Sequence, residues 1–211
     1  MLRVTEIFFS IQGEAKFSGL PSVFIRLTGC PMRCAYCDSA YAFHGGEKRN
    51  IEDVIQEIKQ FKTPYITVTG GEPLAQRECI DLMQSLCDQN YIVSLETGNA
   101  VSIEHVDPRV HVVLDIKTPD SNEEKNNKYE NLALLKSTDQ LKFVICSRED
   151  YEWSREFVRS KQLNKQCEVL FSPSAQQIKA KNLAEWILAD QLAVRFQTQL
   201  HKQLWGDVPG V

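Results

Sequence analysis

The sequence has no apolar run that approaches the roughly 20 residues a membrane-spanning helix needs, so we expect no membrane contact. It also has no basic excess, because 24 Lys and Arg stand against 28 Asp and Glu, a formal net charge of −4. A large nucleic-acid-binding surface usually requires a basic domain or stripe, and we therefore expect no direct nucleic-acid partner. The N-terminus lacks both a signal-peptide core and a basic transit pattern, which favours a cytoplasmic location.

We also find no internal repeat, no low-complexity tract and no interdomain linker. A chain of 211 residues with 43% apolar and 25% charged residues fits one substantial core, so we expect residues 1–211 to form a single domain. The absence of a linker and the ordinary composition together indicate one globular unit, and the order of the predicted elements decides its fold class.

Apolar residues follow strand and helix periodicity in alternation along the chain. We expect strands at 4–11, 21–28, 65–69, 91–95, 110–116, 141–146, 169–171 and 193–197, and helices at 51–61, 76–89, 131–136, 148–161 and 183–188. Such alternation predicts βαβ units and a parallel sheet. Six or seven parallel strands are too few for a closed eight-stranded barrel. We therefore predict an α/β fold, an incomplete TIM-like barrel of about six parallel strands with a reduced set of helices. Residues 118–128 are nearly free of apolar side chains and predict an exposed loop.

Seven cysteines are too unevenly spaced for a disulfide framework. Cys30, Cys34 and Cys37 follow a predicted strand with the spacing C-x-x-x-C-x-x-C, and no fourth cysteine is near. A structural zinc site needs four ligands, and His44 or Asp38 would have to complete it. An iron–sulfur cluster with one open iron is the favoured alternative, since thiolates suit iron–sulfur chemistry. The other cysteines lack ligand spacing and are expected to be core or surface thiols (Cys79, Cys87, Cys146 and Cys167).

Polar loops follow several of the predicted parallel strands, and such loops lie at one rim of the sheet. They are the three-cysteine loop, the turn Gly70-Gly71-Glu72-Pro73, the turn Glu96-Thr97-Gly98-Asn99, Lys117, and Ser172-Pro173. Two glycines allow backbone groups to approach a ligand closely, and Glu72 is suited to accept a hydrogen bond from an amino group. By itself the glycine turn is a weak signal, but five polar loops on one rim predict a site.

The three-cysteine loop, with an aromatic residue before its last cysteine, and the Gly-Gly-Glu-Pro turn together resemble the radical S-adenosylmethionine (SAM) superfamily. The resemblance implies that Cys30, Cys34 and Cys37 hold a [4Fe–4S] cluster whose fourth iron binds SAM. It implies reductive cleavage of SAM to a 5′-deoxyadenosyl radical, with Tyr36 near the adenine and Gly70 to Glu72 at the amino group.

A closer resemblance covers nearly the whole chain. Segments 9–14, 24–30, 37–39, 67–73, 115–117, 171–173 and 199–211 are similar to the 7-carboxy-7-deazaguanine synthase family. This resemblance implies a carbon–nitrogen lyase of queuosine biosynthesis. Its reaction would contract 6-carboxy-5,6,7,8-tetrahydropterin to 7-carboxy-7-deazaguanine with loss of ammonia, assisted by Mg²⁺.

The family resemblance also implies the roles of individual residues. The pterin would be bound by Ile11, Gln12, Gly13, Glu14, Arg26, Thr69 and the C-terminal Val211. SAM would be bound by Tyr36, Cys37, Asp38, Gly70, Gly71, Glu72, Asp115, Ile116, Lys117, Ser172, Pro173, Ser174 and Ala175. Ser39 would be a ligand of Mg²⁺. Arg26 can also be interpreted as half of a salt bridge at a strand end.

Two other functions fit part of the pattern. One is a different short radical SAM enzyme, such as an activase that places a glycyl radical on a protein partner. The other is a non-catalytic zinc or iron–sulfur protein. The resemblance further implies a homodimer and an electron donor such as flavodoxin or ferredoxin. Ala15 departs from the family pattern, which commonly has Gly there, and predicts a more restricted turn.

Overall fold

The computed structural model describes residues 1–175, 177–206, 208 and 210. In this part of the chain the strands form one nine-stranded sheet in the order β3-β1-β2-β4-β5-β6-β7-β8-β9. In this order every neighbouring pair from β2–β4 to β8–β9 is parallel, whereas β1 pairs antiparallel with both β2 and β3. The sheet keeps two free edges, β3 and β9, so the predicted incomplete barrel is confirmed. The antiparallel extension was not predicted.

The element bounds agree with the predicted ranges to within a few residues. The strands are β1 (Leu2–Ile11), β2 (Pro21–Leu27), β3 (Glu47–Arg49), β4 (Tyr65–Gly70), β5 (Ile92–Thr97), β6 (His111–Ile116), β7 (Gln140–Ile145), β8 (Glu168–Pro173) and β9 (Arg195–Phe196). The helices are α1 (Ile51–Ile58), α2 (Glu78–Asp88), α3 (Arg148–Lys161), α4 (Ala180–Ala189) and α5 (Leu200–Trp205). Sequence analysis missed β3 and α5, which are too short to give a clear period.

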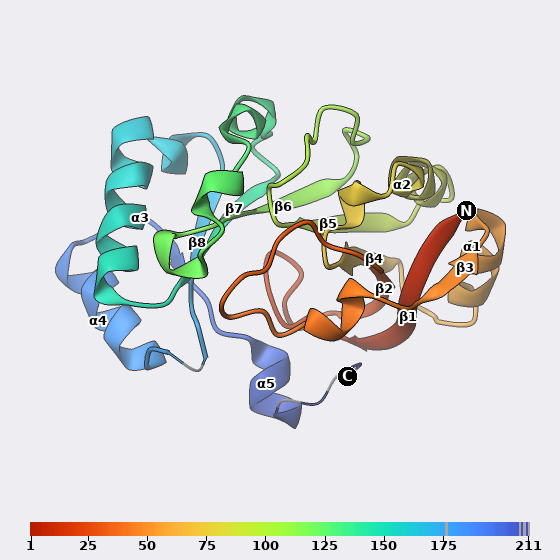
Figure 1. The fold of residues 1–211 in the computed structure, drawn as a ribbon, viewed down its shortest axis with the longest axis horizontal. Coiled ribbons are helices and arrows are strands. Elements are labelled where there is room, and N and C mark those ends of the chain that lie inside the picture. Colours follow the sequence, from red (N-terminus) through yellow and green to blue (C-terminus); the bar gives the residue numbers. More distant parts are fainter. Residues whose placement is uncertain (176, 207, 209, 211) are drawn as a thin grey trace.

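The central parallel strands β4, β5 and β6 have nearly continuous buried runs, which is typical of strands covered on both faces. Val54, Ile55 and Ile58 form the buried face of α1, as the helical spacing predicted. Figure 1 shows α3 and α4 beside β7 and β8 at one end of the sheet, and α1 and α2 at the other end. The connection from β5 to β6 contains no helix, as its length predicted. None of the described helices has the length and apolar character required to cross a bilayer.

The segment 118–128 confirms its prediction in part. Most of its residues are exposed, as expected for an exposed loop, but Thr118, Ser121 and Glu123 are buried in the structure. It forms two short 3-10 turns, Pro119–Ser121 and Glu124–Asn126. Internal hydrogen bonds make burial of its polar groups possible, because Thr118 Oγ1 donates to Asp150 Oδ2 at 2.9 Å and Ser121 Oγ donates to the Thr118 carbonyl at 2.6 Å. The predicted helix at 131–136 is likewise a 3-10 helix, Tyr129–Leu134.

The loop between β1 and β2 is fixed to strands far away in the sheet. Its Ala15 side chain packs with Val113 and Leu170, and the backbone there has φ = 61°, the left-handed region. The amide of Ala15 donates to Gln197 Oε1, and that of the next residue donates to Gln140 Oε1, each at 2.7 Å. The loop that carries residues 12–14 is therefore tied to the opposite half of the sheet.

Candidate active site

A cavity of about 550 Å³ lies where the carboxyl ends of the parallel strands meet. We call it the central cavity. Segments that follow β2, β4, β5, β6 and β8 line it, together with β1 and the chain around α5. The rim predicted from the polar loops is thus a single concave site of the size that small molecules occupy.

The three-cysteine loop forms one wall of this cavity. Cys30, Cys34 and Cys37 all line it, are partly exposed and are free thiols, whereas the four other cysteines are buried. The loop packs closely on the end of β4, since the amide of Glu72 donates to the Gly29 carbonyl at 2.9 Å. A Cβ atom on Gly71 would lie 2.5 Å from Cys30 Cβ. The glycine is therefore required for the close approach of the two loops.

Burial changes the acidity of the thiols. It raises the pKa of Cys34 to about 11, and it also raises the pKa of Cys30. A group bound to these sulfurs as thiolates would have to replace their protons, which a cationic iron centre does. Among the described residues no three His, Cys, Asp or Glu side chains are gathered to hold a metal ion. What fits a cluster here is the set of three free thiols that line one cavity. His44, which would have to complete a zinc site, is exposed and does not line that cavity.

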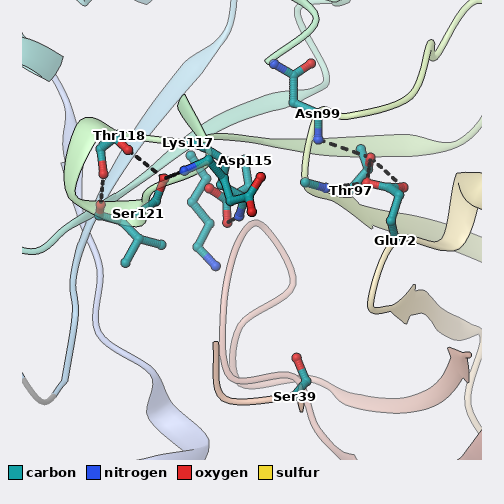
Figure 2. A network of polar contacts seen from close by, with 12 residues as sticks. Ser39, Glu72, Thr97, Asn99, Asp115, Lys117, Thr118 and Ser121 are labelled. Carbon is teal, nitrogen blue, oxygen red and sulfur yellow. Dashed lines mark hydrogen bonds and ion pairs between the residues drawn. The ribbon is translucent and has the colours of Figure 1, made fainter. Parts of the chain in front are cut away.

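Glu72 ties the loops after β4 and β5 together. Its carboxylate accepts hydrogen bonds from the Leu74 amide at 3.0 Å, the Thr97 hydroxyl at 2.9 Å and the Gly98 amide at 2.8 Å. Figure 2 shows Thr97 directly beside this carboxylate. Burial raises the pKa of Glu72, and the side chain is fully inaccessible. Gly71 and Gly98 line the cavity, whereas Gly70 and Glu72 lie behind it. A direct contact of Glu72 with a ligand stays a prediction.

A second group of predicted SAM contacts lies after β6. Lys117 Nζ forms an ion pair with Asp115 Oδ2 at 3.1 Å and lies 5.8 Å from the centre of the Tyr36 ring. Burial opposes the charge of Lys117, but Asp115 and neighbouring groups hold its pKa well above the ordinary value. The buried Tyr36 hydroxyl has no hydrogen-bond partner among the described residues. Ile116 is in the hydrophobic core instead.

The residues that follow the main part of β8 also reach the cavity. All four members of the predicted segment line it (Ser172, Pro173, Ser174 and Ala175). The Ser174 amide donates to the Ile145 carbonyl at 2.8 Å, which fixes this segment to the end of β7. The segment after β8 is thus joined to the end of β7, whose Val144 also lines the cavity.

The loop after β1 also contributes to the cavity lining. Gln12 is buried, its Nε2 donates to Thr67 Oγ1 at 2.9 Å, and its Oε1 accepts from the Glu14 amide at 3.2 Å. Glu14 forms an ion pair with Lys142. Burial alone would raise the pKa of Glu14, but the attraction and hydrogen bond of Lys142 leave it below the ordinary value.

Other predicted pterin contacts differ in their positions. Ile11, Gln12, Glu14, Arg26 and Thr69 line the cavity. Gly13 lies behind them, where its carbonyl accepts from the Leu200 amide at 3.0 Å and a Cβ would lie 2.1 Å from His201 Nδ1. Val211 lies outside the described residues, so its contact stays a prediction.

Arg26 lies in a frame of aromatic and acidic side chains. Its Nε donates to Glu6 Oε1 at 2.6 Å, and the hydroxyl of Tyr41 donates to the same oxygen at 2.7 Å. The guanidinium carbon is 5.8 Å from the Phe8 ring and 5.6 Å from the Tyr41 ring. The salt bridge considered from the sequence is present, yet Arg26 also faces the cavity. The nearby stacked rings of Phe8 and Phe24, 4.8 Å apart, give this end of the cavity a flat apolar surface.

Ser39 lies on the cavity wall beyond the cysteines, on the loop in the lower part of Figure 2. Its hydroxyl is 3.4 Å from Asp38 Oδ1. Asp38 also accepts from Gln199 Nε2 at 3.3 Å and pairs with Lys202 at the same distance. Burial opposes ionisation of Asp38, but Lys202 and Gln199 hold its pKa below the ordinary value. An anionic oxygen next to the Ser39 hydroxyl suits a hard cation such as Mg²⁺.

Sequence reasoning missed four cavity residues or their partners: Glu6, Tyr41, Glu96 and Lys142. Glu96 is the most informative, because its Oε1 is buried with no hydrogen-bond partner among the described residues. Burial raises its pKa to about 8. It is the penultimate residue of β5 and belongs to the polar stretch Glu96-Thr97-Gly98-Asn99 that the sequence singled out, and that stretch was the available signal. Lys142 gave no such signal, since it is a single charged residue within the strand predicted at 141–146.

Comparison with known proteins agrees with this architecture. The profile of the Radical SAM superfamily matches residues 24–136, more than half of the chain. The crystal structure of QueE from Escherichia coli has a similar fold, with a TM-score of 0.78, 22% identity, and coverage of 95% of this chain and 94% of that chain. The chain is therefore a radical SAM enzyme, and the superfamily implies a [4Fe–4S] cluster, SAM and a source of electrons.

Curated relatives place the chain more closely. The 7-carboxy-7-deazaguanine synthase of Chlorobaculum tepidum is 40% identical over 100% of this chain and 97% of its own length. Those of Koribacter versatilis and Thermoplasma acidophilum are 39% and 34% identical, each with at least 97% of both chains covered. The chain belongs to the 7-carboxy-7-deazaguanine synthase family.

Proposed function

We propose that the central cavity, within a single radical SAM domain of residues 1–211, converts 6-carboxy-5,6,7,8-tetrahydropterin to 7-carboxy-7-deazaguanine with release of ammonia. The observation that carries this proposal is that one cavity joins two groups of residues. The three free thiols line it, and so do Arg26 and the stacked rings of Phe8 and Phe24. A glycyl-radical activase would need an open surface for a large protein partner, whereas this site is a cavity of small-molecule size.

Cys30, Cys34 and Cys37 would hold a [4Fe–4S] cluster, which with SAM supplies a 5′-deoxyadenosyl radical for hydrogen abstraction. Gly71 and Gly98 expose backbone groups to the amino-acid part of SAM, and Glu72 holds their loops in place. Tyr36, the Asp115–Lys117 pair and the segment Ser172–Ala175 form the side that would hold the adenosine.

The pterin would be held by the cavity residues around Arg26 and Glu14. Glu6 uses the Nε edge of Arg26, which leaves the terminal nitrogens of the guanidinium to bind the pterin carboxylate. Thr69 and the ionised Glu14, paired with Lys142, would bind the polar edge of the ring. Because the Gln12 amide is engaged with Thr67 and Glu14, it would act mainly by fixing the loop.

Ser39 would bind a magnesium ion, and water and substrate oxygen atoms would complete the coordination of that ion, since Mg²⁺ usually keeps several waters. Asp38 beside it supplies negative charge. We further propose a homodimer in the cytoplasm that receives electrons from a flavodoxin or a ferredoxin. The second subunit and the electron donor are proposed from the family resemblance alone.

The proposal is tested under anaerobic conditions with the reconstituted and reduced protein. Incubation with SAM, Mg²⁺ and the carboxylated tetrahydropterin should yield 7-carboxy-7-deazaguanine and 5′-deoxyadenosine, measured by chromatography and mass spectrometry. Arg26→Ala should raise the KM for the pterin by about tenfold or more, the effect of losing one charge-assisted hydrogen-bond pair. Its iron content and slow SAM cleavage without substrate should remain. Absence of the deazaguanine product from a protein that holds its cluster would refute the proposed reaction. An unchanged KM for the pterin in Arg26→Ala would refute the role of Arg26.

A further inference from the structure

The segment 118–127 supports the three-cysteine loop from outside the cavity. The amide of Ala35 donates to the Ser121 carbonyl at 3.0 Å, and the amide of Arg33 donates to Glu123 Oε1 at 2.6 Å. These two amides flank Cys34 in the sequence. The segment therefore fixes the backbone on both sides of the central cysteine and occupies both N–H groups.

Glu123 is held firmly in this position. The side chain is 8% exposed, its own amide donates to Ser121 Oγ at 3.1 Å, and its second carboxylate oxygen accepts from Asn126 Nδ2. Ser121 is anchored in turn to the Thr118 carbonyl. Neither group that hydrogen-bonds to the Glu123 carboxylate is a cation, so these contacts orient its negative charge without neutralising it.

The cation on the same loop is bound elsewhere. The guanidinium of Arg33 donates to the carbonyls of Cys30 and Met32, at 2.8 and 2.6 Å, and its central carbon lies 4.2 Å from the centre of the Phe43 ring. Arg33 thus closes the loop on itself with its side chain, while its backbone is bound to Glu123. The loop has two separate supports, and of the two only Glu123 is an acid. Lys117 and Asp115 also act electrostatically on Cys34, from the cavity side.

We propose that Glu123 is a positioning residue for the cluster loop and that its charge lowers the reduction potential of the [4Fe–4S] cluster held there. The proposal rests on the cluster assignment made under the proposed function. Reduction adds an electron to the cluster, and a buried negative charge nearby opposes it. Hydrogen bonds to cluster sulfurs raise the potential, and here the amides of Arg33 and Ala35 donate to Glu123 and Ser121 instead.

Glu123→Gln separates the charge from the shape. The amide oxygen of Gln can still accept from the Arg33 amide, and Asn126 can reverse its own amide to match. We expect full iron loading and a midpoint potential for the cluster that is more positive than in the wild-type protein, measured by electron paramagnetic resonance in a redox titration without SAM or pterin. Glu130→Gln is the matched control, because it removes the same charge from an exposed residue of the 3-10 helix Tyr129–Leu134.

Glu123→Ala tests the positioning role without the cluster. In the cluster-free protein, we expect faster hydrogen–deuterium exchange at peptides that contain Arg33 and Ala35, and unchanged exchange in the β5–β6 region. A midpoint potential in Glu123→Gln equal to that of Glu130→Gln would overturn the electrostatic role. Unchanged exchange in Glu123→Ala would overturn the positioning role. Since neither measurement uses the pterin, both results are independent of whether the proposed reaction occurs.

Discussion

At the scale of single residues, the cavity contains an acid that is poorly suited to its surroundings. Burial raises the pKa of Glu96 from 4.5 to about 8, and one of its oxygens is buried without a hydrogen-bond partner among the described residues. Lys142 favours the charged form but does not overcome burial, and Glu14 and Asp115 add to the shift. A residue of this kind costs stability in the protein without ligands, and such a cost is common where a site is shaped for a ligand.

The pH dependence of stability should reveal this cost. In the folded chain Glu96 keeps its proton up to a pH of about 8, whereas in the unfolded chain it loses the proton near its ordinary pKa of 4.5. The folded state binds more protons between these values, so the contribution of Glu96 to stability falls as the pH rises through this window. Glu96→Gln should therefore raise the melting temperature of the cluster-free protein more at a pH of about 9 than at about 5. An equal effect at both pH values would show that Glu96 titrates normally.

The residues that sequence reasoning recognised are those whose chemistry is local. The cysteine spacing and the Gly70-Gly71 pair are readable from neighbours in the chain, and the three cysteines and Gly71 line the cavity, whereas Gly70 does not. Glu6 was not recognised, because its importance arises from its cross-strand neighbour Arg26, 20 positions away. Glu72 was expected to face a ligand, but its burial depends on Thr97 and Gly98 of another loop.

At the scale of elements, the main contact is the packing of the cysteine loop on the end of β4. Gly71 makes it possible, since an added Cβ would lie 2.5 Å from Cys30 Cβ and 2.6 Å from the Gly29 carbonyl oxygen. Such distances require one loop to move. The backbone of Gly71 itself is not in the left-handed region, so a substitution there tests steric contact alone.

Gly71→Ala should displace the cysteine loop and reduce the iron bound per chain after reconstitution by half or more, while the far-ultraviolet circular dichroism of the protein is retained. Gly19→Ala is the control, because Gly19 has φ = 90° and open space around it, and the substitution adds backbone strain without a clash. We expect a lower melting temperature but normal iron content in the control. If both variants lose iron equally, general destabilisation accounts for the effect and the steric contact does not.

Elements were predictable where an apolar run or a helical period was clear, as in β6 and α3. The buried positions of the segment 118–128 were not, because a polar composition indicates exposure unless the fold supplies partners for the polar groups. Here those partners come from Asp150 on α3 and from the cysteine loop. The hydrogen-bond partners of a polar segment are a property of the tertiary fold and cannot be read from its composition.

At the scale of the whole molecule, the sheet remains open and the chain closes the site by other means. Alternating strands and helices were enough to predict a partial parallel barrel. They did not predict the antiparallel pairs that β1 forms with β2 and β3, since strand direction depends on where a connection crosses. Nor did they predict α5, which Figure 1 shows apart from the helices that cover the sheet. The chain around α5 nevertheless contacts both predicted ligand loops, those of residues 13–14 and 38–39.

Gln199, just before α5, is the point where these contacts meet. Its Nε2 donates to Glu14 Oε1 at 2.9 Å and lies 3.3 Å from Asp38 Oδ2, so one amide holds two carboxylates that would otherwise repel. Because one carboxylate lies in the proposed pterin site and the other beside the proposed magnesium ligand, Gln199→Ala should affect both. We expect a several-fold higher KM for the pterin together with a higher Mg²⁺ concentration for half-maximal activity, from steady-state rates at varied substrate and metal. Gln203→Ala, on α5 itself, removes only a hydrogen bond to Thr198 and should leave both values unchanged. A change in one value alone would mean that Gln199 serves one loop, and that the two sites are not coupled through the chain around α5.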